Sequence, residues 1–335
     1  MAASCLSSGG RWAAHARVCA DAVPMARSVS TATRWASSSC KQPFHIHFVG
    51  CNGVPSACYS PLLERIGVAS TSYTEVCTLA GGDWHAPINR IVADVAAAKQ
   101  RVGPDVEVVG FGHSMGGAML YAASTRSTDT MSRLLVFDPP MFRPTLRALM
   151  LALQVTGLFE WHPLVRAARK RPTSFASRKE AEAFVASRRL YASFHPDILA
   201  AFLARGLVED GSVAGEGGQG RTAFLFTPDN EADIFRSTPS DLHTSAGGPW
   251  GRGMGQYAPS HCESGVFMYS TRHEFNAKAN VDWLRGALCA TGGVAGAAAA
   301  EGGRPFFFDG RDVGHFHPLT DPDETAHWVR EWLQS

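Results

Sequence analysis

The feature that most constrains this chain is a repeated alternation of strand-like and helix-like blocks, which begins near residue 43. Short apolar or alternating blocks predict strands, and longer blocks with helical periodicity predict helices. Along the first part of the chain we expect strands at 44–49, 72–79, 106–111 and 134–137, and helices at 88–100 and 115–124. This order predicts a mostly parallel sheet covered by helices on both faces, an α/β fold.

The alternation of strands and helices stops in the middle third of the chain, where helical blocks follow one another without an intervening strand. These blocks cover 146–158, 163–170, 178–187 and 196–203, and a Gly-rich linker follows at 211–220. We interpret residues 143–262 as an inserted helical cap with its linker. The core would then comprise 43–142 and 263–335, with about six main strands.

The C-terminal part returns to the sheet pattern. We expect a strand at 266–269, a helix at 277–288, a low-complexity loop at 291–303 and a strand at 305–308. The last helix has a clear start signal, because Asp321 can act as its N-cap, Pro322 suits the first helical position, and Glu324 follows three residues after the cap.

Charge divides the chain into two parts. Residues 1–42 hold five cations and one acid, whereas residues 43–335 hold 26 cations and 29 acids. A slightly acidic body argues against a nucleic-acid partner, which calls for a basic surface. No run of 18 uncharged apolar residues predicts a spanning helix. The eight cysteines contain no C-x-x-C pair, and we expect mostly reduced thiols.

The first 42 residues are rich in Ala, Ser and Arg. This cationic, hydroxyl-rich composition predicts an organelle transit peptide, because such segments are drawn to import machinery and negative membrane potentials. We expect a mitochondrial location, with a plastid or the cytoplasm as alternatives. A plain disordered tail is the alternative interpretation of the segment.

One short motif indicates a catalytic nucleophile. Gly112-His113-Ser114-Met115-Gly116-Gly117 lies between the strand expected at 106–111 and the helix expected at 115–124. A G-x-S-x-G turn in this context lifts a serine hydroxyl clear of the sheet at a helix N-terminus, where negative charge is favoured. We therefore predict that Ser114 is a nucleophile, and a helix N-cap is the alternative role.

A serine nucleophile needs a base. His315 follows the strand expected at 305–308, so it should lie at the same sheet edge as Ser114. His317 is the rival, two residues further on, but Pro318 and the approaching helix favour a positional role for it.

Taken together, these motifs resemble the α/β-hydrolase superfamily, and more closely a group of small bacterial-type hydrolases with an N-G-F-P-like loop. The resemblance covers about residues 43–335. Its motifs are Asn52-Gly53-Val54-Pro55, Tyr59-Ser60-Pro61, the turn around Ser114, Asp138-Pro139-Pro140 and Gly314-His315-Phe316-His317-Pro318. It implies an α/β-hydrolase fold with an inserted cap and an oxyanion hole formed by the Met115 and Val54 amides, with Gly53 beside Val54.

The acid of the triad remains open. In most members of the superfamily it follows the strand that here ends near Tyr269, where the matching residue is His273. Glu274 is adjacent to that position. Some members take the acid from the strand next to the nucleophile, which favours Asp138 here. Asp309, Asp312 and the absence of any acid are further alternatives.

Other residues do not indicate a cofactor or a metal. His45 and His47 would share one face of a strand, but no third ligand accompanies them, and Cys51 is better interpreted as a small buried residue. We expect no cofactor and no metal.

The cap sequence combines apolar residues between 149 and 161 with many cations between 166 and 189. This pattern suits an acyl substrate or a peripheral lipid contact, and an ordinary amphipathic surface is the alternative. We expect a serine hydrolase that cleaves a carboxylic ester through an acyl-enzyme on Ser114, with lysolipids and other acyl compounds among the candidate substrates. A thioesterase, a C–C hydrolase or an acyltransferase is an alternative within enzymes, and an idle ligand- or partner-binding protein is the alternative outside them.

Overall fold

In this computed structural model the described residues are 42–76, 84–126, 131–210, 221–237, 264–272, 274, 277–290 and 306–335. Residues 1–41 of the predicted transit peptide, the linker at 211–220, the end of the predicted cap at 238–262, the loop at 291–303 and His273 lie outside them. Gln42 already belongs to the sheet. The described part of the chain belongs to one compact unit, Lys41–Ser335.

A six-stranded sheet forms the centre of this unit, with the strand order β2-β1-β3-β4-β7-β8. Every neighbouring pair of its strands is parallel. The strands are β1 (Gln42–Val49), β2 (Val68–Tyr73), β3 (Glu107–His113), β4 (Arg133–Phe137), β7 (Ser264–Ser270) and β8 (Phe306–Arg311). The prediction of a parallel sheet with about six strands is confirmed.

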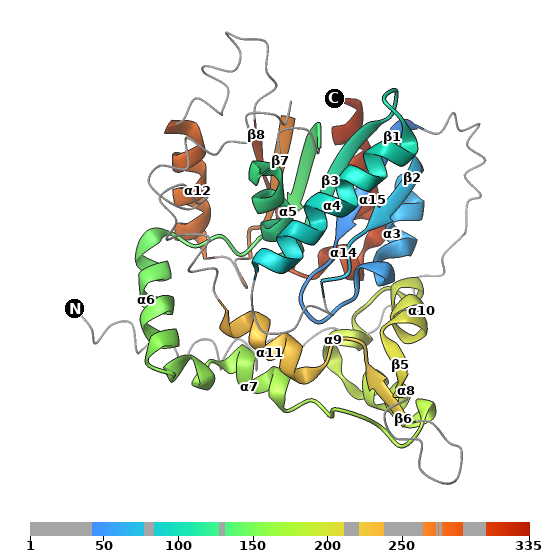
Figure 1. Ribbon diagram of the computed structural model, residues 1–335, viewed down its shortest axis with the longest axis vertical. Coiled ribbons are helices and arrows are strands. Elements are labelled where there is room, and N and C mark those ends of the chain that lie inside the picture. Colours follow the sequence, from blue (N-terminus) through green and yellow to red (C-terminus); the bar gives the residue numbers. More distant parts are fainter. Residues whose placement is uncertain are drawn as a thin grey trace. The chain divides into compact units, whose positions relative to one another are not determined.

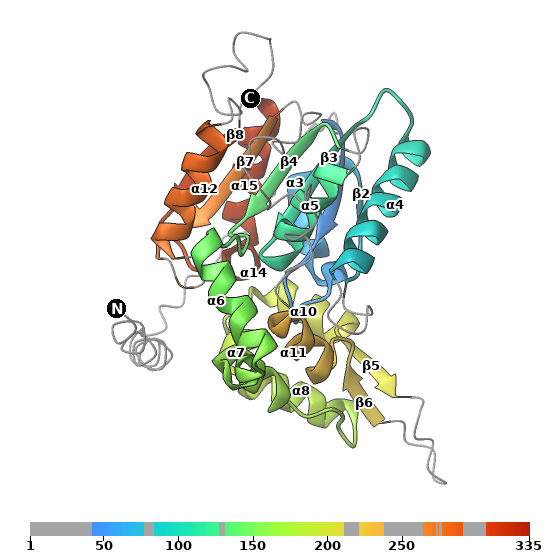
Figure 2. The ribbon, with the colours of Figure 1, turned by 60° about the vertical axis from the view of Figure 1, so that its left-hand side comes forward.

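Helices cover both faces of the sheet (Figures 1 and 2). On one face lie α4 (His85–Val102), α5 (Met115–Arg126) and α12 (Lys278–Ala290), whose apolar side chains join those of the strands in one core cluster. On the other face lie η1 (Ser56–Tyr59), α3 (Ser60–Ile66) and α15 (Pro322–Gln334), in a second cluster. Burial of these two apolar surfaces is the main stabilising contribution of the core.

The second strand lies earlier than predicted. The sequence indicated 72–79, whereas β2 ends at Tyr73. Its apolar signal is weak because this edge strand presents Ser70 and Ser72 to His45 and His47 of β1, and hydroxyl–imidazole hydrogen bonds replace apolar contacts there.

Between β4 and β7 the chain forms a cap that begins with α6 (Pro144–Val155), η2 (Leu158–Trp161), α7 (Pro163–Arg169) and α8 (Arg178–Ser187). It continues with α9 (Arg189–Ala192), α10 (Pro196–Arg205), β5 (Leu207–Asp210), β6 (Arg221–Phe224) and α11 (Pro228–Arg236). Four of its helices begin with proline, which suits the first helical position because the amide there has no helical acceptor. The antiparallel pair β5–β6 was not predicted.

After β8 the chain forms the short helix α14 (His317–Thr320) and then α15. The predicted start of α15 is confirmed, because Asp321 Oδ1 accepts a hydrogen bond from the Glu324 amide at 2.9 Å and Pro322 is the first helical residue. None of the described helices combines the length and the hydropathy that crossing a membrane requires.

Candidate active site

Ser114 occupies a tight turn between β3 and α5. Its φ of 54° is left-handed, and its amide donates a 2.8 Å hydrogen bond to the Phe137 carbonyl oxygen of the neighbouring strand. The turn tolerates only glycine at its flanks, because a Cβ on Gly112 would lie 2.5 Å from the Gly117 Cα, and one on Gly116 would collide with backbone atoms at the end of β1. The glycines of the motif thus allow a strained serine at the C-terminal end of the sheet.

Three side chains from distant segments meet at this turn. His315 Nε2 lies 3.0 Å from Ser114 Oγ, and His315 Nδ1 lies 2.6 Å from Asp138 Oδ2. A carboxylate only accepts, so Nδ1–H donates to Asp138, and Nε2 is left to accept the Ser114 hydroxyl proton. The side chains of His315 and Asp138 are 5% and 0% exposed. This is the geometry of an activated serine.

Asp138 is held by its backbone as well. Its φ is 45°, and its amide donates a 2.7 Å hydrogen bond to the Met268 carbonyl oxygen of β7. Within the described residues, Ser114 and Asp138 are the two non-glycine residues with positive φ. Such strain concentrates at functional sites, where the surrounding structure enforces it.

Glu274 supports the histidine loop from a different direction. Its Oε2 accepts a 2.9 Å hydrogen bond from the His315 amide, so this contact is with the backbone of His315. The carboxylate also limits position 314, since a Cβ on Gly314 would lie 3.3 Å from Glu274 Oε2. Of the candidate acids, the geometry favours Asp138.

A buried chain of polar groups, which sequence reasoning missed, links the turn to the histidine loop. His113 Nε2 lies 2.9 Å from the His315 carbonyl oxygen, and His113 Nδ1 lies 2.7 Å from the Tyr59 hydroxyl. A carbonyl only accepts, so Nε2–H donates, and Nδ1 must accept from the Tyr59 O–H. Burial lowers the pKa of His113 well below its ordinary value, which keeps this neutral tautomer. The sequence shows a histidine directly before Ser114, but nothing near it indicates Tyr59 or the His315 carbonyl as its partners.

The chain of polar groups ends at Cys51, before the predicted oxyanion loop. Cys51 Sγ lies 3.1 Å from the Tyr59 hydroxyl oxygen, which must accept here because its proton goes to His113. Burial raises the pKa of Cys51 to about 12, so its thiol is not ionised. Cys51 is therefore a buried supporting group, in keeping with its sequence interpretation.

The predicted oxyanion donors come from the first turn of α5 and from the loop between β1 and η1. Met115 is the first residue of α5, where an amide has no acceptor within the helix. The Val54 amide makes a long, 3.4 Å turn contact with the Cys51 carbonyl oxygen, and Gly53 provides the bend with a φ of 82°.

No protein-family model matches the sequence, and a search of curated proteins finds no match. Solved structures do match. The peroxisomal α/β-hydrolase Lpx1 from Saccharomyces cerevisiae is 13% identical, with a TM-score of 0.59 over 88% of this chain and 78% of that chain. MenH from S. aureus is 12% identical, with a TM-score of 0.51 over 88% and 94%. The M. tuberculosis esterase Rv0045c is 11% identical, with a TM-score of 0.52 over 89% and 87%.

The chain has the α/β-hydrolase fold. The resemblance seen in the sequence is confirmed at the level of the fold. Within this fold Ser114 occupies the strand-to-helix turn after β3, and His315 follows the last strand, β8.

The cap of this α/β-hydrolase fold contacts the predicted oxyanion loop, Asn52-Gly53-Val54-Pro55, through α11. Asn52 Nδ2 donates a 3.0 Å hydrogen bond to the Glu231 carbonyl oxygen, and a Cβ on Gly53 would lie 3.1 Å from Glu231 Oε1. The Glu231 carboxylate forms an ion pair with Arg171, whose guanidinium lies 4.3 Å from the Phe224 ring centroid. Both charged side chains are largely buried, at 15% and 13% exposure, so losing one partner would leave the other uncompensated.

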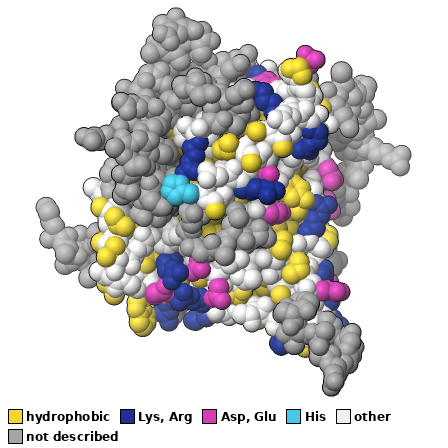
Figure 3. Space-filling model, in the orientation of Figure 1, with side chains coloured by type: hydrophobic (Ala, Val, Ile, Leu, Met, Phe, Trp, Pro, Cys, Tyr) yellow, Lys and Arg dark blue, Asp and Glu magenta, His cyan; other side chains and the backbone are white. Residues whose placement is uncertain are grey.

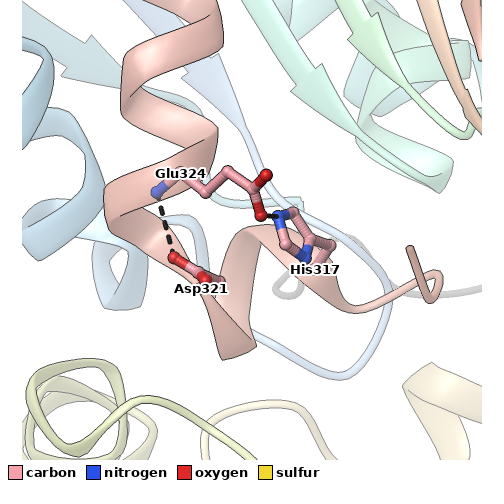
Figure 4. A group of neighbouring side chains, drawn as sticks. All are labelled: His317, Asp321 and Glu324. Carbon is pink, nitrogen blue, oxygen red and sulfur yellow. Dashed lines mark hydrogen bonds and ion pairs between the residues drawn. The ribbon is translucent and has the colours of Figure 1, made fainter. Parts of the chain in front are cut away.

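His317, the rival base, faces α15 instead of Ser114. Figure 4 shows it directed at Glu324, and the distance from His317 Nε2 to Glu324 Oε2 is 3.2 Å. Its ring stacks on Trp328 with centroids 4.8 Å apart. The contact anchors α14 to α15.

His317, Asp321 and Glu324 place potential metal-ligating atoms within 4.8 Å of one another. Asp321, however, already caps α15, and the positive end of that helix opposes a bound cation. We interpret the group as a helix cap.

His45 and His47 use their ring nitrogens in the sheet. The partners are the hydroxyls of Ser70, Ser72 and Thr74, at 2.7 to 3.0 Å. Burial lowers the pKa of each histidine to about 4, so both are neutral at pH 7.

Proposed function

We propose that the protein is a serine hydrolase that cleaves carboxylic esters through an acyl-enzyme on Ser114. The observation that carries the proposal is the hydrogen-bonded line from Ser114 through His315 to Asp138. The α/β-hydrolase fold of the chain is consistent with it, but folds host many activities, so the proposal depends on the site.

In the proposed reaction the Ser114 oxygen attacks the ester carbonyl carbon while His315 Nε2 accepts the hydroxyl proton. Asp138 stabilises the imidazolium, and the Met115 and Val54 amides donate to the oxyanion, each lowering the activation free energy by about 3 kcal/mol. Collapse of the tetrahedral intermediate breaks the C–O bond, and His315 returns the proton to the leaving alkoxide. Water then attacks the acyl-enzyme by the reverse sequence and regenerates Ser114.

A carboxylic ester suits a serine nucleophile, because attack by Ser114 on its carbonyl carbon gives an acyl-enzyme ester that water can cleave. Thioesters and activated C–C bonds share the same intermediate and remain alternatives within the mechanism. An idle binding protein was suggested by His273 at the usual acid position. The contact between Asp138 and His315 Nδ1 argues against this alternative, because it supplies an acid from another strand.

Hydrolysis of p-nitrophenyl esters of graded acyl length tests the proposal. We expect turnover by the wild type and a loss of about 10³-fold or more in Ser114→Ala, because the residual rate comes only from binding and the oxyanion donors. Ser124→Ala is the matched control, since Ser124 lies on the same helix with its hydroxyl bonded to the Tyr121 carbonyl oxygen. Turnover that survives in Ser114→Ala contradicts the proposal.

A further inference from the structure

The outer side of the cap carries an unusual concentration of exposed apolar side chains. Nine large hydrophobic residues are exposed within the described part of the chain, and five of them lie between residues 149 and 161. We call these five the cap edge: Leu149, Leu151 and Val155 of α6, and Leu158 and Trp161 of η2. Val155 is 80% exposed and Trp161 is 70% exposed.

Helix α6 is apolar on its inner side as well. Met150 and Leu153 pack against the small cluster that contains Phe159 and Val165, while Leu151 and Val155 face outward. Over its twelve residues α6 has one charged residue, Arg147. A helix that is apolar all round is expected to be covered on all sides. Figures 1 and 2 show no described helix or strand over the outer side of α6.

Charge next to the cap edge is strongly positive. Residues 143–170 hold five cations and one acid, although residues 43–335 as a whole carry more acids than cations. The single acid, Glu160, is already paired with Arg169 and Arg236. Figure 3 shows hydrophobic side chains along the left edge, over α6, with Lys and Arg side chains beside them, over α7.

Trp161 lies where the apolar cap edge meets the cationic side chains of α7. The Arg166 guanidinium lies 5.6 Å from the Trp161 ring centroid, and Arg166 and Lys170 are exposed. Tryptophan prefers the headgroup level of a bilayer, and Arg and Lys next to it can pair with lipid phosphates while their aliphatic stems stay on apolar surface. A protein partner would not require this combination, whereas an anionic lipid surface uses both the apolar and the cationic groups.

We propose that the cap edge docks on the surface of an anionic lipid membrane. Leu149, Leu151 and Val155 would enter the boundary between headgroups and acyl chains, and the neighbouring cations would contact lipid phosphates. The contact is peripheral, and it does not depend on the chemistry proposed for Ser114.

Sedimentation of the full chain with lipid vesicles tests the proposal. One set of vesicles is phosphatidylcholine alone, and the other contains about 30 mol% phosphatidylserine. We expect binding to the anionic vesicles that weakens as salt rises, and a drop of about tenfold or more in the partition coefficient of Val155→Ser/Trp161→Ser. Val208→Ser is the matched control, because Val208 is an exposed valine on β5, outside the cap edge.

Three outcomes overturn the proposal. One is the absence of binding to either kind of vesicle. Another is equal binding by the wild type and Val155→Ser/Trp161→Ser, which would assign the contact to other residues, such as the cationic 1–42 segment. The third is a dimer in sedimentation velocity that dissociates in the double variant, which would make the cap edge an interface between two copies of the chain. Circular dichroism and thermal unfolding establish that each variant is folded.

Discussion

Replacing Asp138 by Asn separates the two candidate acids and tests the proposed role of the first. The Asp138 side chain is fully buried, with Oδ2 2.6 Å from His315 Nδ1. An amide of the same shape can present its NH₂ group to Nδ1, which then has to accept. The proton moves to Nε2, and His315 can no longer accept the Ser114 proton. Loss of the correct tautomer lowers kcat by about 10³- to 10⁴-fold in serine hydrolases.

The matched variant is Glu274→Gln. Its amide oxygen can still accept from the His315 amide, so the 2.9 Å backbone contact survives without the charge. We expect a change in kcat of less than about tenfold, because only a neutral hydrogen bond replaces a charge-assisted one. Initial rates with a p-nitrophenyl ester at pH 8 give kcat for Asp138→Asn and for Glu274→Gln. A nearly unchanged Asp138→Asn together with a large loss in Glu274→Gln would refute the assignment of Asp138.

Four further perturbations follow from the structure. His113→Leu removes the donor to the His315 carbonyl, and we expect kcat to fall about tenfold or more with KM nearly unchanged, whereas His113→Gln, which keeps an N–H donor, should restore part of it. Glu231→Gln breaks the buried pair with Arg171 and should lower the free energy of unfolding by about 3 kcal/mol in urea titrations; a loss below about 1 kcal/mol would contradict the buried pair. Burial lowers the pKa of His47 to about 4, so its imidazole is neutral in the folded protein at pH 5 to 7. In the unfolded chain the same imidazole has its ordinary pKa of 6.5 and binds a proton below that pH. The free energy of unfolding should therefore fall by about 2 kcal/mol between neutral pH and pH 5 because of this group. His47→Gln should flatten the fall of stability between pH 6.5 and 5, and an unchanged slope would contradict the shift. Residues 1–42 fused to a fluorescent protein should direct it to mitochondria, and a diffuse signal would refute the targeting prediction.

The fold was accessible from the sequence because its strongest signals are local. The Gly112–Gly117 motif between a buried strand and a helix fixes the turn, and Asp321 with Pro322 fixes the start of α15. β2 was misplaced because its sequence is polar and it is held by hydrogen bonds to His45 and His47 of β1. The β5–β6 pair was missed because each strand has only four residues, too few for an alternating pattern to be recognised. Periodicity within one segment carries no record of such partners.

In the candidate site, too, the residues with a local sequence signal could be predicted and those defined by distant contacts could not. Ser114 and His315 could be selected from motif and chain order, but the choice between Asp138 and Glu274 depends on which carboxylate reaches Nδ1 in three dimensions. The supporting contacts could not be predicted, because their partners are far apart in the sequence. His113 contacts Tyr59, 54 positions away, and the His315 carbonyl, 202 positions away, and Glu231 contacts Asn52 from the cap. No local pattern reveals such pairs.

The most direct test of the proposed chemistry is to react the folded protein with a fluorophosphonate and to locate the adduct by peptide mass spectrometry. Attack by an activated serine on phosphorus expels fluoride and leaves a stable phosphonyl ester. We expect one adduct, on Ser114, with labelling abolished in Ser114→Ala and strongly slowed in His315→Ala. A folded wild-type protein that is not labelled, or one labelled equally in Ser114→Ala, would contradict the account.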